Sequence, residues 1–228
     1  LYVTCGGPKG VVCVVETGSG NVVSTIAVGH TPRSPVLLPD GKRLVVCNQF
    51  TDDVSFIDLA AGKESARVKA IREPYGVAAS PDGSLVFVTN LLPVDASDSY
   101  DVASEVTVIE TATLETSSIR LPNGSSSVHE VCVSPDGTYA YVAHILSRYQ
   151  MPTTQLERGW MNTNALSIID VAERKLLNTV LLDDIDLGAA NPWGVATTAD
   201  GKQIIVSHRG THELSVIDAE GLIEKLKS

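Results

Sequence analysis

Histidine is the side chain in this sequence best suited to metal binding or proton transfer, and three of the five histidines stand at comparable places. His144 and His208 end the apolar runs AYVAH and QIIVSH, and His129 begins the run HEVCVSPDG. A neutral imidazole can ligate a metal or haem iron and can move protons near neutral pH. Together with Arg33 and Arg148, the same histidines could bind an anion. The competing interpretation is structural, because an imidazole at a strand end can also satisfy loop carbonyls.

The remaining chemistry-bearing residues define no catalytic site. Asp95, Asp98, Asp101 and Glu105 could offer oxygen ligands to calcium, but they lack the D-x-D-x-D-G spacing, so a solvated acidic loop is favoured. The sequence has no P-loop, no G-x-S-x-G, no H-E-x-x-H and no G-x-G-x-x-G that follows a strand. Catalytic residues therefore stay unassigned, and the sequence favours a protein that is not itself an enzyme.

The four cysteines also carry no recognisable chemistry. None lies in a C-x-x-C pair, which argues against a zinc ribbon and against attached c-type haem. Each stands in an apolar, strand-like run, where a free cysteine behaves as a small buried hydrophobe. We expect buried thiols, with disulfides not indicated, at these positions: Cys5, Cys13, Cys47 and Cys132.

The elements that must position these residues are revealed by an internal repeat. A P-D-G or A-D-G triplet places its aspartate at 40, 82, 136 and 200, and an apolar run closing on Asp or Glu follows each triplet and also occurs once before the first. The unit without insertions is 42 residues long, the distance from Asp40 to Asp82. A period in the low forties, built from short strands and turn signals, is typical of propeller blades.

Each unit divides into four strands, which we call a, b, c and d in chain order. Strand a precedes the Asp-Gly turn, strand b follows it, strand c is the V-S-x-I-D type of run, and strand d completes the unit. The sequence therefore predicts an all-β propeller with about five four-stranded antiparallel blades, some incomplete, in a single domain over 1–228. The predicted blades span 1–30, 31–71, 72–121, 127–182 and 190–228. We expect them to belong to a ring of seven or eight blades. About five blades alone would not close, and their open strand edges would favour self-association.

Propeller geometry turns this division into a map of function. The a–b and c–d turns should lie on one face, and the b–c and d–a loops on the other, which receives every insertion. The long b–c loops cover roughly 91–104 and 145–164. Because loops tolerate variation that blade turns do not, this face is the expected binding face. Its loop residues Glu157, Arg158 and Trp160 could form a docking surface, and the equally favoured alternative is that Trp160 pins the loop.

Residues at equal places in the repeat should form rings around the channel mouth. The start of strand a carries Arg33, Tyr75, His129 and Trp193, and the end of strand b carries Cys5, Asn48, Asn90, His144 and His208. Since strand a is innermost, we expect Tyr75 and Trp193 to be aromatic groups at the mouth. The three histidines would then approach one another there.

The units resemble a known repeat. LYVT at 1–4 and PYGVAASPDGSLVFVTN at 74–90 are similar to the YVTN β-propeller repeat of bacteria and archaea, across almost the whole chain. The runs at 144–170 and 208–218 resemble propellers joined to c-type cytochrome or di-haem peroxidase-like domains, and the units are also similar to surface-layer propellers. The resemblance implies a periplasmic or cell-surface location and a cytochrome-like partner domain. No haem-attachment sequence is present, so any haem or metal would come with that partner.

Composition narrows the choice of partners. Seventeen Lys and Arg stand against 27 Asp and Glu, a formal charge of −10, which disfavours nucleic acid as a partner. No apolar run is long enough to cross a bilayer. Three hypotheses remain: an extracytoplasmic binding module that docks a haem-containing partner or a small ligand, a redox enzyme portion with metal or haem at the mouth, and a structural surface-layer repeat.

Overall fold

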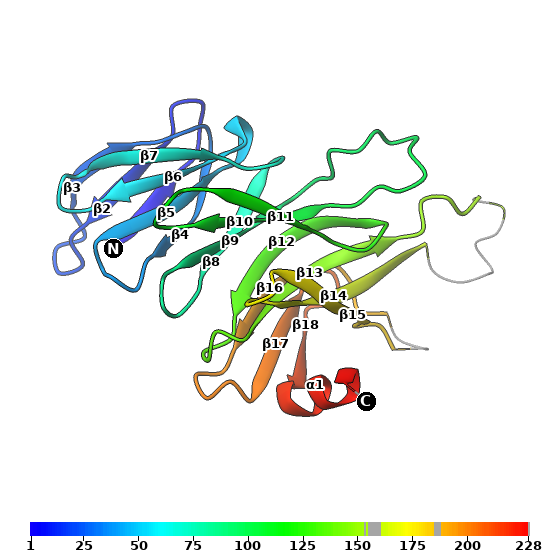
Figure 1. The fold of residues 1–228 in the computed structure, drawn as a ribbon. Helices are drawn as coiled ribbons and strands as arrows, with labels where there is room; N and C mark the ends of the chain where they lie inside the picture. Colours follow the sequence, from blue (N-terminus) through cyan, green and yellow to red (C-terminus); the bar gives the residue numbers. More distant parts are fainter. Residues whose placement is uncertain (153, 155–160, 185–187, 228) are drawn as a thin grey trace. The chain divides into compact units, whose positions relative to one another are not determined.

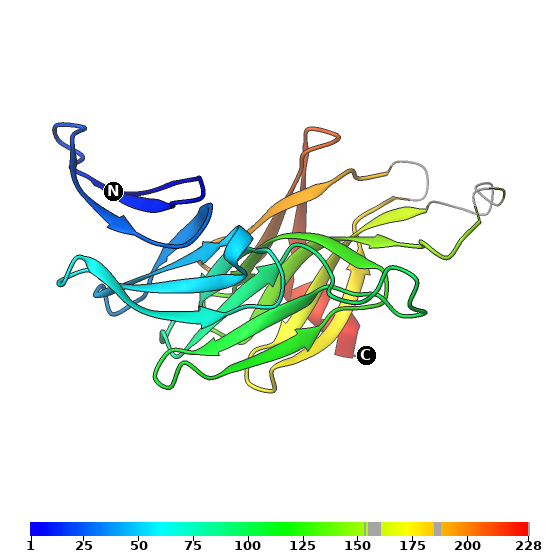
Figure 2. The same cartoon turned by 90° about the horizontal axis from the view of Figure 1, so that it is seen from above.

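The computed structural model describes residues 1–152, 154, 161–184 and 188–227, and it consists of antiparallel sheets (Figures 1 and 2). The first sheet has the strands β1 (Tyr2–Cys5), β2 (Val11–Val15) and β3 (Val22–Ala27). The second has β4 (Pro32–Leu37), β5 (Arg43–Asn48), β6 (Asp53–Asp58) and β7 (Lys63–Lys69), with a short 3-10 turn, η1 (Gln49–Thr51), between β5 and β6.

The remaining strands form three further sheets. The third sheet has β8 (Pro74–Ala79), β9 (Leu85–Asn90), β10 (Glu105–Glu110) and β11 (Thr116–Arg120). The fourth has the longer strands β12 (Ser125–Val133), β13 (Tyr139–Ser147) and β14 (Asn162–Asp170), followed by β15 (Lys175–Leu181). The fifth has β16 (Pro192–Thr197), β17 (Gln203–His208) and β18 (Glu213–Asp218), followed by the helix α1 (Ala219–Lys227).

In every sheet the hydrogen-bonded order follows the chain order, as propeller blades require, so the predicted all-β fold is confirmed. Each sheet lies within one of the five predicted ranges, except that β12 begins at Ser125, two residues before the fourth range. Within the described residues, no helix has the length and apolar character needed to cross a membrane.

The Asp-Gly turns are built as their residue types predict. In the turn after β8, Asp82 accepts hydrogen bonds from the backbone N–H and the hydroxyl of Ser84, and Gly83 has a φ of 71°. Hydrogen bonds from Ser80 and Ser84 lower the pKa of Asp82 to about 2. The aspartates of the other three turns make the same kind of contact, and their pKa values are lowered too: Asp40, Asp136 and Asp200. These carboxylates are therefore structural turn caps.

The fourth sheet shows how the strand ends divide into two sets. Ser125 of β12 lies opposite Leu146, and Ser147 of β13 lies opposite Asn162 of β14. The b–c loop and the d–a connection therefore leave from one end of this sheet. The opposite end, where Tyr139 faces Asp170, carries the two short turns. This confirms, within the sheet, the predicted separation of loops from turns.

The chain divides into two compact units, each with its own apolar core. The first unit holds 1–90 and 107–117, and the second holds 91–106 and 118–228. In the first unit Phe56, Val54 and Val86 are almost fully buried in one cluster. In the second unit Leu166, Ile168 and Ile204 are fully buried, and the apolar side of α1 packs against their cluster. Burial of such branched and aromatic side chains supplies the main stabilisation of each unit.

Candidate functional site

The residue predicted to end strand b makes an equivalent side-chain contact with strand c in every sheet. Asn48 Nδ2 donates to Ser55 Oγ at 2.8 Å, and Asn90 Nδ2 donates to Thr107 Oγ1 at 3.0 Å. His144 Nε2 lies 2.8 Å from Ser167 Oγ, and His208 Nε2 lies 2.8 Å from Ser215 Oγ. In the first sheet Cys5 and Cys13 occupy the same two places. We call these contacts the b–c pairs, because each joins strand b to strand c.

The b–c pairs decide the role of two predicted ligands. His144 is fully buried, and its second nitrogen, Nδ1, lies 3.1 Å from the carbonyl oxygen of Ile145. Both ring nitrogens are thus used, and burial lowers the pKa of His144 to about 4, so the ring is neutral at pH 7. Burial also lowers the pKa of His208, against the opposing effects of Glu213 and Asp183. Both histidines take the place that asparagine has in the second and third sheets.

The geometry of the described residues does not support a metal ion shared by His129, His144 and His208, and haem binding by these residues stays a prediction. In the described part of the chain, no three His, Cys, Asp or Glu side chains are grouped so as to hold a metal ion. The physical reason is that His144 already gives both nitrogens to protein atoms and has no solvent-facing surface. The side chains of His144 and His208 contact strand c of their own sheets, whereas His129 stacks on Trp193 of the neighbouring sheet.

The residues at the start of strand a do form contacts across neighbouring blades. In the first unit, the Arg33 guanidinium lies 4.6 Å from the centre of the Tyr75 ring. Arg33 Nε also donates to the Gln49 side-chain carbonyl, and Gln49 Nε2 donates to Glu73 at 2.9 Å. Arg33 and Tyr75 border a cavity of about 290 Å³. An arginine held in this way is fixed in direction and presents a cation beside an aromatic ring.

The second unit has a corresponding cluster, which we call the mouth cluster: His129, Trp193 and Arg209. The rings of His129 and Trp193 are stacked with centres 3.7 Å apart, and the Arg209 guanidinium lies 4.6 Å from the centre of the Trp193 ring. All three line a cavity of about 350 Å³. Contacts between strand-a residues of neighbouring sheets are thus seen twice, once in each unit. That all four residues share one rim stays a prediction.

Backbone strain marks the same places in the repeat. The residue two positions before each of Arg33, Tyr75, His129 and Trp193 has a positive φ, between 47° and 53°: Thr31, Glu73, Ser127 and Asn191. Non-glycine residues rarely adopt this conformation, which costs about 1 kcal/mol or more. Its recurrence in four blades shows that the fold itself requires this bend. The bend sets the direction in which the mouth side chains leave strand a.

The long loops of the second unit join into one structure, which we call the loop platform. It combines the 91–104 loop with 120–124 and 147–151. Tyr149 donates its hydroxyl to the carbonyl of Tyr100 at 3.0 Å and also contacts the Asn123 side-chain carbonyl at 2.8 Å. The Gln150 amide donates to the same Tyr100 carbonyl. Tyr100 is nevertheless 84% exposed and Tyr149 is 37% exposed, so the platform presents aromatic surface to solvent.

An ion pair fixes the base of the loop platform. Arg120 contacts Asp95 at 2.9 Å and Glu105 at 3.4 Å. Asp95 also accepts a hydrogen bond from the backbone of Ala103, and together these contacts lower the pKa of Asp95. Two of the four proposed calcium ligands are therefore bound to a cation of the protein. This agrees with the structural interpretation of the acidic loop and disfavours calcium.

Gly124, at the base of the loop platform, gives a direct test of how rigidly the platform is built. Its φ is 92°, and a Cβ at this position would stand 2.1 Å from the carbonyl oxygen of Ser147. We expect Gly124→Ala to lower the free energy of unfolding by about 2 kcal/mol or more. Amide exchange should rise in 91–104. Gly18→Ala meets nothing within 4 Å and is the matched control, with no change expected in 91–104. Unchanged exchange in Gly124→Ala would show that the platform does not depend on this contact.

The other predicted site residues are only partly placed. Arg148 is exposed at the base of the fourth b–c loop. Among the described residues, it makes no hydrogen bond with any of the three histidines. Glu157, Arg158 and Trp160 lie outside the described residues. Sequence reasoning missed Arg209, Tyr100 and Tyr149. Arg209 follows the strand-b histidine directly, so repeat register could have found it, whereas the tyrosines stand in insertions that no other blade repeats.

One further group has an unusual pKa. Glu130 follows His129 on β12, and burial raises the pKa of Glu130 to about 7. A carboxyl group that titrates near neutral pH can exchange protons there. It does not line the cavity of the mouth cluster, so it adds no second group to that site.

Antiparallel sheets of three or four strands in chain order, with recurring Asp-Gly turns and b–c pairs, define a β-propeller repeat protein. The family model of the YNCE-like β-propeller matches residues 7–129, more than half of the sequence, and the chain belongs to this family.

Two curated proteins are similar to this chain. Hydrazine synthase subunit beta of Kuenenia stuttgartiensis is 25% identical over 220 residues, which cover 94% of this chain and 44% of that protein. The seven-bladed β-propeller protein Rv1057 of Mycobacterium tuberculosis is 28% identical over 159 residues, 69% of this chain and 36% of that protein. The chain thus spans less than half the length of each. Among solved structures, Kuenenia stuttgartiensis hydrazine synthase matches 99% of this chain and 78% of that chain, with a TM-score of 0.59 and 24% identity, which supports the fold alone.

Proposed function

We propose that this chain is a non-catalytic β-propeller binding module that docks a partner protein through the loop platform. The partner that the sequence resemblance favours is a haem-containing electron-transfer domain, outside the cytoplasm. The observation that carries the proposal is the platform itself, in which hydrogen bonds fix two inserted loops and still leave aromatic side chains exposed.

The physical argument begins with the cost of ordering a loop. An insertion with no role would need no fixed conformation, whereas the 91–104 loop is held by Arg120, by Asn123 and by Tyr149. Pre-ordered loops bind with a smaller loss of conformational entropy. Tyrosine is enriched in protein interfaces, and the platform exposes the rings of Tyr100 and Tyr149, with the Tyr149 hydroxyl held by hydrogen bonds. The platform therefore has the chemistry of a protein-binding surface.

The relatives support a role in assembly. One of them is, by its name, a subunit of hydrazine synthase, so a propeller of this kind occurs in a protein with other subunits. The enzyme alternative loses its main support, because the three histidines do not form a shared metal site in the described residues. The cavity of the mouth cluster, about 350 Å³, is at the lower end of the volumes of small-molecule sites and would suit one anionic or planar group.

A double variant tests the docking proposal. Tyr100→Ala with Tyr149→Ala removes both exposed aromatic rings of the platform and the hydrogen bonds that Tyr149 makes. We expect its affinity for a purified c-type cytochrome, measured by biolayer interferometry at physiological salt, to fall by about tenfold or more, since interface tyrosines commonly contribute over 1 kcal/mol each.

The matched control is Phe50→Ala, which removes an exposed aromatic ring of the first unit. It should bind the cytochrome as the unmodified chain does. Equal losses in both variants, or no cytochrome binding by the unmodified chain, would contradict docking of a haem protein through the platform.

A further inference from the structure

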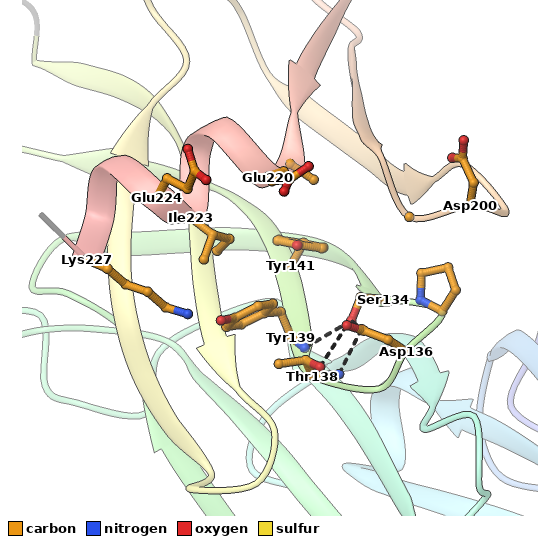
Figure 3. A pocket seen from close by; sticks show the side chains of 13 residues that line it. Ser134, Asp136, Thr138, Tyr139, Tyr141, Asp200, Glu220, Ile223, Glu224 and Lys227 are labelled. Atoms are coloured by element: carbon orange, nitrogen blue, oxygen red, sulfur yellow. Dashed lines mark hydrogen bonds between the residues drawn. The ribbon is translucent and has the colours of Figure 1, made fainter.

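A cavity of about 670 Å³ lies in the second unit, at the end of the fourth sheet that carries the Asp136 turn (Figure 3). It is bordered by the turns after β12 and β16 and by α1, and we call it the α1 cavity. Its volume is that of a small-molecule site. Sequence analysis did not find it, because a helix at the end of the chain can pack in several places and the pattern does not say where.

Tyr141 is the first sign that the α1 cavity accepts a ligand. The residue is only 2% exposed and lines the cavity from β13, between α1 and the turn that carries Asp136 (Figure 3). In the described part of the chain its hydroxyl makes no hydrogen bond with the protein. A tyrosine hydroxyl that faces a cavity can donate a hydrogen bond to a ligand or accept one from it.

The charge around the α1 cavity indicates which kind of ligand the cavity would attract. Four carboxyl groups line it, Asp136 and Asp200 from the turns and Glu220 and Glu224 from α1, against one cation, Lys227. The turn hydrogen bonds lower the pKa values of Asp136 and Asp200, so both stay ionised at neutral pH. An excess of negative charge beside a low-dielectric wall attracts cations.

The protein already places a cation of its own in this environment. The Lys227 ammonium lies 5.8 Å from the centre of the Tyr139 ring, which lines the same cavity (Figure 3). Ammonium groups bind to aromatic faces at such distances. Lys227 is an exposed residue in the last turn of α1, so its side chain can leave without unfolding the sheet.

We propose that the α1 cavity is a binding site for an organic ammonium ion. The ammonium group would contact the ring faces of Tyr139 and Tyr141 and donate a hydrogen bond to the Tyr141 hydroxyl, and Glu220 and Glu224 would balance its charge. Lys227 occupies part of the site when no ligand is bound. The ligand is either a free amine or a lysine side chain of a partner, and both share this chemistry. The site is separate from the platform and extends the proposed function.

Isothermal titration calorimetry at low ionic strength, where exposed charges are least screened, tests the site. The probes are 1,4-diaminobutane for a free amine and Nα-acetyl-lysine amide for a lysine side chain. We expect saturable binding of at least one probe. Glu220→Gln with Glu224→Gln should weaken it about tenfold, and Tyr141→Phe severalfold, while Lys227→Ala should tighten it by removing the competing ammonium. Preference for one probe identifies the source of the ligand.

Glu173→Gln is the matched control, because it removes an exposed carboxylate of the same unit outside the cavity. It should leave the affinity unchanged. Absence of saturable binding by both probes would overturn the proposal. An affinity loss in Glu173→Gln equal to that of the Glu220→Gln, Glu224→Gln variant would also overturn it, because the probe would then respond only to net charge. A weaker affinity in Lys227→Ala would overturn it as well.

The first sheet carries an independent inference about the b–c pair of Cys5 and Cys13. The two Sγ atoms lie 3.4 Å apart on adjacent strands, in the diagonal arrangement that brings Asn48 to Ser55. Cys5 is exposed, contrary to the expectation that every thiol is buried, and it is accessible to an oxidant. A disulfide has its sulfurs about 2.05 Å apart, so closing this one needs a further movement of about 1.4 Å.

We infer that Cys5 and Cys13 form a disulfide under oxidising conditions. Each thiol loses its proton, the two sulfurs bond, and the two electrons pass to a disulfide oxidant, which is reduced to two thiols. Cys47 and Cys132 are not part of it, because Cys47 is buried and the sulfur of Cys132 lies near Thr197. The covalent bond would replace the hydrogen bond of the other b–c pairs in this sheet.

Incubation with oxidised glutathione, followed by peptide mapping without reduction, tests the disulfide. The number of free thiols counted in denaturant should fall from four to two, and one disulfide-linked peptide should join Cys5 to Cys13. Cys13→Ser should instead give a glutathione adduct on Cys5. An adduct on Cys5 in the unmodified chain, or any link that includes Cys47 or Cys132, would overturn the inference.

Discussion

Replacement of His144 by alanine should lower the free energy of unfolding at pH 7.5 by about 3–5 kcal/mol, as large truncations in a packed interior do. The ring is fully buried and contacts Ser167 and the Ile145 carbonyl, so its removal leaves a void and breaks both contacts. His144→Asn should lose only about 1–2 kcal/mol, because asparagine makes the same b–c pair in the second and third sheets. Urea unfolding measures both.

Replacement of His144 should also change how the free energy of unfolding depends on pH. In the unfolded chain the imidazole titrates near 6.5, and in the folded chain burial lowers the pKa of His144 to about 4. Between these values the unfolded state binds the extra proton, so stability is complete above pH 6.5 and falls as the pH drops toward 4, by about 3 kcal/mol for this residue. His208, whose pKa is lowered by burial, contributes in the same direction.

His144→Asn should therefore show a shallower loss of stability between pH 6.5 and 4 than the unmodified chain does. His212→Asn, which changes an exposed histidine, should retain the full slope. If His144→Asn kept the slope of the unmodified chain, the buried, neutral state assigned to His144 would be incorrect.

Replacement of Asn48 by alanine should have a comparable effect in the first unit. The Asn48 side chain is fully buried, accepts a hydrogen bond from the Gly29 amide at 2.9 Å, and donates to Asp53 and Ser55 at 2.8 Å each. Alanine at position 48 leaves the Gly29 N–H without its acceptor, and the buried Asp53 carboxylate loses one of its donors. The expected loss is about 3–4 kcal/mol, since each buried polar group left unpaired costs about 1–3 kcal/mol.

Asn21→Ala is the matched control for Asn48→Ala, because Asn21 is exposed at a turn. Its free energy of unfolding should stay within about 0.5 kcal/mol of the unmodified chain, as is usual for surface substitutions. A loss below about 1 kcal/mol in Asn48→Ala would mean that the b–c pair is not a main support of the blade.

Much of the fold could be predicted from sequence because it repeats. Asp82 with Gly83 specifies a tight turn by local chemistry alone, and the same pair recurs at 40, 136 and 200. Register along the repeat also aligned Arg33, Tyr75, His129 and Trp193, and in the structure Arg33 contacts Tyr75 and His129 stacks on Trp193.

The chemistry of the strand-b ends could not be predicted in the same way. Register gives the position of a Cα atom, whereas the role of His144 depends on the direction of its side chain, which turns toward Ser167 inside the blade. The occurrence of Asn48 and Asn90 at the same place was the available indication that a structural amide-like contact is needed there. Metal binding and proton transfer were predicted from the residue type of His144 and His208, although their position in the repeat already indicated a structural hydrogen bond.

The loop platform and the α1 cavity lay beyond prediction for a different reason. Both depend on contacts that occur once, Tyr149 with Tyr100 in the platform and α1 against Tyr139 and Tyr141 in the cavity. Contacts between insertions have no second copy with which to compare them. Their placement depends on tertiary packing, which periodicity does not encode.

Hydrogen exchange of the chain with and without a c-type cytochrome, followed by mass spectrometry, tests the docking account most directly. The account predicts slower exchange in 91–104, 120–124 and 147–151 when the cytochrome is present, with the Asp-Gly turns at 40–43, 82–85, 136–139 and 200–203 unchanged. Slower exchange at those turns, or none in the loops at concentrations that saturate binding, would contradict it.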